Sequence, residues 1–115
     1  MIAIIDRDRL TAFGLALLLR DWGYETVDGA TADEIFGRAE ARGAAIAAIV
    51  ADDRAENGVS GGDVAAALAA LSRRAIPTVV LGGESAGAPG TAQIPKPLEP
   101  IRLRDLLETM VRIDR

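Results

Sequence analysis

Three charged side chains follow apolar runs in this chain, at the points where buried strands would end. Asp6 closes the run 2–5, Asp52 closes the apolar stretch 44–51, and Lys96 follows a third, shorter run. The carboxyl ends of parallel strands gather at one edge of an open α/β sheet. We therefore expect two carboxylates and an ammonium group to converge there. Such a trio is suited to hold a divalent cation and a phosphoryl group.

The length and composition of the chain indicate one domain spanning residues 1–115. A net charge of −4 disfavours a nucleic-acid surface, which needs a basic stripe. No stretch approaches the roughly 18 apolar residues of a membrane span. The first apolar run starts at the N-terminus, where no signal peptide is visible. We expect a cytoplasmic protein that contacts neither membrane nor nucleic acid.

The sequence contains no cysteine and no histidine. The lack of cysteine removes disulfides and thiol chemistry and fits a cytosolic protein. The lack of histidine excludes a histidine-based catalytic triad, a typical zinc site and a role as a phosphohistidine donor.

Strand-like and helix-like patterns alternate along the chain. Alternation at this spacing predicts an α/β fold, a doubly wound parallel sheet of five strands. In the first predicted helix Leu10, Phe13, Leu17 and Leu18 recur at helical spacing, and we interpret Phe13 as a packing residue. Strands are expected at 2–5, around 25–27, at 44–51, at 76–81 and before Lys96, and helices at 10–23, 31–43, 63–74 and 100–110.

One segment breaks this pattern between the fourth strand and Lys96. Residues 82–93 contain four glycines and a proline, a composition that cannot form a stable helix. We therefore expect a loop there, with at most a single turn.

The motifs around the three charged residues, in this order and spacing, resemble the receiver domain of two-component response regulators. The resemblance covers the whole chain. It implies a flavodoxin-like fold that serves in signal transduction and is not an enzyme. It is carried by Ile5-Asp6-Arg7-Asp8, Val50-Ala51-Asp52-Asp53-Arg54, Ser60-Gly61, Lys96-Pro97 and the segment 17–26.

The resemblance also implies roles for individual residues. Asp52 would be the phosphoacceptor, attacking phosphorus to form an acyl phosphate, and Lys96 would pair with a phosphoryl oxygen or with Asp52. Mg²⁺ would be held by Asp6, Asp52 and the backbone carbonyl of Arg54, with Asp8 as a further carboxylate. The phosphoryl donor would be a histidine kinase or a histidine phosphotransfer protein.

Four features depart from the family pattern. Arg7 stands where the family has a second acidic residue beside the metal, so we expect weak Mg²⁺ binding. Gly82 replaces the Ser or Thr whose hydroxyl contacts the phosphoryl group, and Gln93 replaces the switch aromatic. The fourth helix of the family is expected to be degenerate or missing, because the segment before Lys96 is about two helical turns short.

These departures leave a second interpretation open. The chain would then be a pseudo-receiver, a protein-interaction module that works without phosphorylation. A strand-end aspartate such as Asp52 is, taken alone, a common turn former. A nucleotide-binding or hydrolytic α/β domain is disfavoured, because residues 6–9 lack the glycines of a phosphate loop. In either role we expect a monomer that binds partners through its first helix and the loops around the strand ends.

Overall fold

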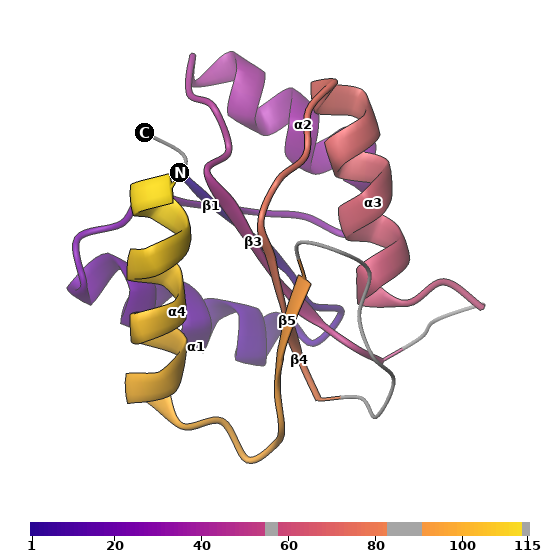
Figure 1. The fold of residues 1–115 in the computed structure, drawn as a ribbon. Coiled ribbons are helices and arrows are strands. Elements are labelled where there is room, and N and C mark those ends of the chain that lie inside the picture. The colour runs from indigo at the N-terminus through magenta and orange to yellow at the C-terminus, as the bar shows by residue number, and fades with distance from the viewer. Residues whose placement is uncertain (55–57, 83–90, 114–115) are drawn as a thin grey trace.

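The computed structural model describes residues 1–54, 58–82 and 91–113, in which strands and helices alternate (Figure 1). The strands are β1 (Ile2–Ile5), β2 (Thr26–Asp28), β3 (Ala48–Asp52), β4 (Thr78–Leu81) and β5 (Thr91–Ile94). The helices are α1 (Arg9–Asp21), α2 (Ala32–Ala41), α3 (Gly61–Ser72) and α4 (Pro100–Ile113).

The five strands form one parallel sheet in the order β2-β1-β3-β4-β5. This is the order of the flavodoxin-like doubly wound fold, so the predicted fold class is confirmed. Strands β1 and β3 are neighbours, with Ile5 opposite Ala51. The residues that follow these two, Asp6 and Asp52, are therefore placed side by side at the carboxyl edge of the sheet.

Two layers of helices enclose the sheet (Figure 1). Side chains of α1 and α4 pack on one face with Ile2 and Ile4, whereas α2 and α3 pack on the other face with Ala3 and Ile5. This division follows from the period of two along a strand, which sends alternate side chains to opposite faces. Because both faces are covered, all four residues of β1 are buried.

The buried face of α1 differs from the predicted one. The interpretation of Phe13 as a packing residue is wrong. Two apolar stripes at helical spacing compete in this helix, and the one that contains Ala12 faces the sheet. The buried residues of α1 are Ala12, Leu15 and Leu19. Large apolar side chains exposed on α1 are Leu10 at 80%, Phe13 at 61% and Leu17 at 51%.

Three element boundaries also differ from expectation. Strand β3 begins at Ala48 rather than at residue 44, and α3 begins at Gly61 rather than at Asp63. Part of the predicted loop 82–93 is strand, because Thr91–Ile94 pairs along its whole length with β4. Pairing with a neighbouring strand supplies hydrogen bonds that the local sequence does not reveal. Residues 83–90, where the missing fourth helix is expected, lie outside the described residues.

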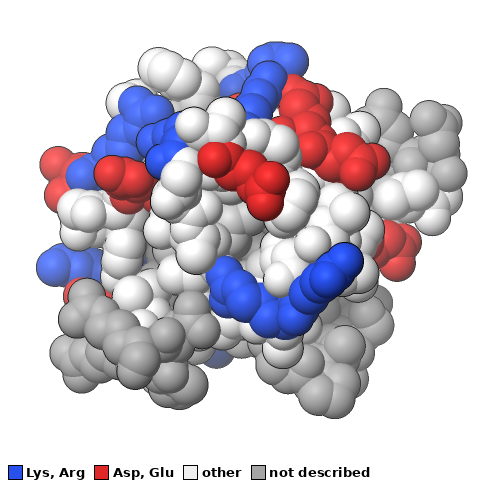
Figure 2. Space-filling model, turned by 90° about the horizontal axis from the view of Figure 1, so that it is seen from above, with Lys and Arg blue, Asp and Glu red and all other residues white. Residues whose placement is uncertain are grey.

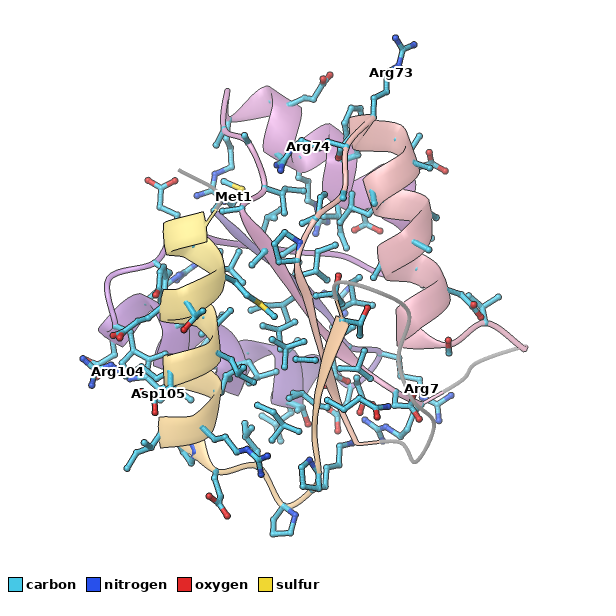
Figure 3. All side chains as sticks on the ribbon, in the orientation of Figure 1. Met1, Arg7, Arg73, Arg74, Arg104 and Asp105 are labelled. Atoms are coloured by element: carbon cyan, nitrogen blue, oxygen red, sulfur yellow. The ribbon has the colours of Figure 1, made fainter. Side chains whose placement is uncertain are left out.

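The end of the molecule at which the strands begin carries charges of both signs. In Figure 2, which views this end, Lys and Arg side chains lie among Asp and Glu side chains. Arg73 projects at this end, and Arg74 lies beside it with its guanidinium donating to the Ile46 carbonyl, on the opposite side of the fold from Arg7 (Figure 3). None of the helices in the described part of the chain is both long and apolar enough to cross a membrane.

Candidate functional site

The three charged residues singled out in the sequence meet at the carboxyl edge of the sheet. Asp52 ends the central strand β3, and its side chain is only 4% exposed. Lys96 follows β5, and its Nζ donates a hydrogen bond of 2.5 Å to Asp52 Oδ1. The lysine side chain is half exposed. A buried carboxylate is thus paired with a cation that solvent reaches.

A fourth side chain, that of Arg54, enters the same site. Its Nε donates to Asp52 Oδ2 at 2.5 Å, and its Nη2 lies 3.4 Å from Asp6 Oδ1. The guanidinium group therefore bridges the two carboxylates. The resemblance to receiver domains implied only a backbone role for Arg54, because no local pattern shows which way a loop side chain turns.

Asp6 and Asp8 have distinct positions. The Asp6 side chain is 2% exposed, and its Oδ1 accepts the backbone N–H of Asp8 at 2.8 Å. The Asp8 carboxylate caps α1, since its Oδ1 accepts the N–H groups of Leu10 at 3.0 Å and Thr11 at 3.3 Å. An aspartate just before a helical pattern is a strong N-cap signal, so the capping role of Asp8 can be read from the sequence. The first helix is thus anchored beside the site.

The carboxylates of the site have opposite pKa shifts. Burial raises the pKa of Asp6, although the Asp8 N–H and Arg54 oppose this effect. Burial would also raise the pKa of Asp52, but hydrogen bonds from Lys96 and Arg54 outweigh it, and the pKa is lowered. The hydrogen bond to Asp52 in turn raises the pKa of Arg54. Asp52 is therefore an ionised carboxylate at neutral pH, held by two cations.

The donor set in this arrangement does not fit a divalent cation. Among the described residues, no three or more acidic, histidine or cysteine side chains are grouped to hold a metal ion. Asp6 and Asp52 are adjacent, but the Arg54 guanidinium bridges them, and Asp8 caps a helix. A hard cation such as Mg²⁺ requires near-octahedral oxygen ligands. Its binding between these carboxylates would require Arg54 to move.

The start of α3 packs directly on the end of β3. Ser60 caps this helix in a full capping box: Ser60 Oγ accepts the Asp63 N–H, and Asp63 Oδ2 accepts the Ser60 N–H. The next residue, Gly61, lies so close to the strand that an added Cβ would be 1.8 Å from the Asp52 carbonyl oxygen. The contact explains why the residue after the cap is a glycine. It fixes α3 against the backbone of the residue that carries the central carboxylate.

The two residues that the sequence predicts as degenerate switch positions lie close together, one just after β4 and the other on the neighbouring strand β5. Gly82 follows β4 with a φ of +86°, and its N–H donates to the Ile94 carbonyl at 2.8 Å. Gln93 is half-buried on β5, in register with Val80. A φ in this region favours glycine over residues with a side chain. Backbone conformation, as well as the missing hydroxyl, therefore separates Gly82 from a serine or threonine.

A hollow at this edge of the sheet joins the charged site to the exposed face of α1. We call it the rim hollow. Arg7, which stands at the position of the expected second acidic residue, lies at this end of the molecule (Figure 3). The lining includes Asp6, Arg7, Phe13, Leu17, Asp52 and Arg54.

The fold is shared with receiver domains of known structure. The chain superposes on a response regulator receiver protein from Sinorhizobium medicae with a TM-score of 0.77 and 20% identity, covering 99% of this chain and 95% of that one. For the chemotaxis protein CheY4 of Vibrio cholerae, the TM-score is 0.75 at 20% identity, with 95% and 96% covered. The receiver domain of the hybrid histidine kinase CckA gives 0.69 at 22% identity, with 96% and 97% covered.

Sequence comparisons add nothing to this likeness. No protein-family model matches the chain, and no curated protein matches it. The receiver fold predicted from the sequence is confirmed by the structural matches, most of which are receiver domains. At these identities the likeness concerns the fold.

Proposed function

We propose that this chain is a phosphorelay receiver domain that accepts a phosphoryl group on Asp52 from a histidine kinase or a histidine phosphotransfer protein. The observation that carries the proposal is the ion pair between Asp52 and Lys96 at the end of the central strand, 2.5 Å long and built on a buried carboxylate. Chemistry in open α/β sheets gathers at this edge. The Asp52–Lys96 ion pair lies at that edge, which supports the proposal.

The chemistry of transfer follows from the site. An oxygen of the ionised Asp52 carboxylate attacks phosphorus, and a P–O bond forms as the P–N bond to the donor imidazole breaks. The electron pair of that bond stays on the imidazole nitrogen, which leaves as a neutral ring when the other nitrogen is protonated. Lys96 and Arg54 provide two positive charges for the phosphoryl oxygens. Because the pKa of Asp52 is lowered, the nucleophile needs no separate base.

Mg²⁺ enters the proposal as a weakly bound ion, and only once the Arg54 guanidinium has left the two carboxylates. Asp6, Asp52 and the Arg54 carbonyl would supply its protein ligands, with Asp8 available only if it left its capping position. Mg²⁺ supplies charge neutralisation to a transferring phosphoryl group. Arg7 and the Arg54 guanidinium, both cationic, oppose its binding.

A donor protein would dock on the face beside the site. The exposed Phe13 and Leu17 of α1 line the rim hollow that contains Asp52, and Leu10 is exposed on the same helix. Apolar side chains exposed together on one helix are typical of an interaction surface. We propose that partners contact α1 and the rim loops, and that the isolated chain is a monomer.

Phosphotransfer from a cognate histidine kinase tests the assignment. Wild type and the Asp53→Asn variant should take up label, whereas Asp52→Asn should not. Asp53 is the matched control, because it is the next carboxylate in the chain and is half-buried at the same edge. Equal labelling of the two variants would exclude Asp52 as the phosphoacceptor.

The pseudo-receiver remains a second candidate, favoured by Gly82. This residue has no hydroxyl, and its φ of +86° disfavours residues that would provide one. The phosphate mimic beryllofluoride, added with saturating Mg²⁺, distinguishes the two roles. A phosphorylatable receiver should show a higher melting temperature with the mimic, and this increase should vanish in Asp52→Asn. Unchanged melting of wild type would favour the pseudo-receiver.

A further inference from the structure

The central carboxylates already have a cation of their own. Arg54 is anchored to Asp52 by a 2.5 Å bond from Nε, and its Nη2 reaches Asp6 at 3.4 Å. Both carboxylates are nearly inaccessible to solvent, with exposures of 4% and 2%. Two buried negative charges side by side repel each other strongly unless a positive charge compensates them. The guanidinium group lies where that charge is needed.

The two carboxylates are already paired in this state. Asp52 contacts Arg54 and Lys96, and Asp6 contacts Arg54. Among the described residues, no buried side-chain nitrogen or oxygen lacks a hydrogen-bond partner. The two contacts of Asp52 use different oxygens, Oδ1 for Lys96 and Oδ2 for Arg54. Three of the four carboxylate oxygens, Asp52 Oδ1, Asp52 Oδ2 and Asp6 Oδ1, thus already accept hydrogen bonds from the protein.

We propose that Arg54 is a built-in counter-cation of the Asp6–Asp52 pair, and that its guanidinium must leave Asp52 before a divalent cation can bind between the two carboxylates. A planar guanidinium suits this role, since it forms two directed hydrogen bonds to two carboxylates at once. A lysine would offer only a point charge. The Arg54 side chain is 45% exposed, so its guanidinium group has solvent to turn into when it leaves Asp52.

This inference rests on the proposed function, but it is tested by measurements that do not involve phosphotransfer. It concerns the site before any phosphoryl group arrives, and it makes Arg54 the main competitor of Mg²⁺. Arg7 also lines the rim hollow; Arg54 contacts both carboxylates directly, at 2.5 Å and 3.4 Å. Failure of phosphotransfer would therefore leave the inference standing, because none of its measurements uses a phosphoryl donor.

The test compares Arg54→Ala with Arg104→Ala. Arg104 is a matched control: it also carries one positive charge and is also about half exposed, and its partner, Glu108, lies on α4. It lies on the opposite side of the molecule from Arg7 (Figure 3). Calorimetric titration with MgCl2 should show Mg²⁺ binding at least about tenfold tighter in Arg54→Ala than in wild type. Arg104→Ala should bind as wild type does.

A second measurement uses melting temperatures in EDTA. Without divalent cations, Arg54→Ala should melt below wild type, because the two carboxylates then repel each other without compensation. Added Mg²⁺ should recover most of this loss in Arg54→Ala and change wild type little. In an Asp52→Asn background, Arg54→Ala should cost much less, since the repelling pair no longer exists. Equal Mg²⁺ affinities in wild type and Arg54→Ala, or equal melting temperatures in EDTA, would overturn the proposal.

Discussion

Replacement of Gly61 by alanine should disrupt the junction between α3 and β3. The added Cβ would lie 1.8 Å from the Asp52 carbonyl oxygen and 3.2 Å from Ala51 Cβ. Real Cβ atoms essentially never lie within 3.0 Å of another such heavy atom. Helix α3 and strand β3 must therefore separate by about 1.2 Å, the difference between 3.0 Å and 1.8 Å. Forcing such a shift in a packed region costs about 1–3 kcal/mol.

The neighbouring glycine provides the control. An added Cβ at Gly62 would meet only Ser60 Oγ, at an ordinary contact distance of 3.6 Å, and Gly62 is not among the residues with positive φ. Alanine has the better helix propensity by about 0.5–1 kcal/mol. Gly62→Ala should therefore be neutral or stabilising. The two substitutions differ by one position in the same helix and should have opposite effects.

Thermal and urea unfolding of the two variants measure this contrast. For a domain of this size we expect Gly61→Ala to lower the melting temperature by roughly 5–20 °C, and Gly62→Ala to maintain or raise it. Displacement of the β3 end should also reduce phosphotransfer to Asp52 in the folded fraction of Gly61→Ala. Equal stability of Gly61→Ala and wild type would refute the close approach of α3 to Asp52.

Three further predictions concern the site and its surroundings. Asp6→Asn should be more stable than wild type at neutral pH, because burial raises the pKa of Asp6 and its ionised form opposes folding. In urea titrations this stability advantage should shrink as pH falls through about 4. A wild type more stable than Asp6→Asn at neutral pH would contradict the prediction. Gly82→Ser should lower the free energy of unfolding by about 1 kcal/mol, because the φ of residue 82 is +86°. A free energy of unfolding equal to that of wild type would argue against this backbone conformation. Light scattering should find a monomer with and without beryllofluoride; a dimer that forms only with the mimic and is disrupted by Arg104→Ala would show that α4 is the interface instead.

Much of the fold follows from the sequence for simple reasons. Short apolar runs that alternate with helical patterns leave few topologies other than a doubly wound sheet. The same reasoning brings Asp52 and Lys96 together, because parallel strands end at one edge. Strand β5 was harder to predict, since residues 91–93 follow a glycine-rich segment and are ordered by pairing with β4. Such pairing is tertiary information.

The site itself was predicted only in part. The direction of the Arg54 side chain depends on which charges lie across the sheet, and 48 residues separate it from Asp6. No local pattern encodes that contact. By contrast, two helix caps are visible in the sequence: Asp8 precedes a helical pattern, and Ser60 stands three residues before Asp63, which is the spacing of a capping box. The exposed stripe of α1 had the same period as the buried one, so periodicity alone did not separate them.

The most direct test of this account locates the phosphoryl group. After phosphotransfer, an acyl phosphate on aspartate is reduced by borohydride to homoserine, which peptide mass spectrometry identifies by position. We predict homoserine at position 52 and no conversion at the neighbouring Asp6, Asp8 or Asp53. Conversion at one of those residues, or labelled protein without homoserine at position 52, would contradict the assignment of Asp52 as the phosphoacceptor.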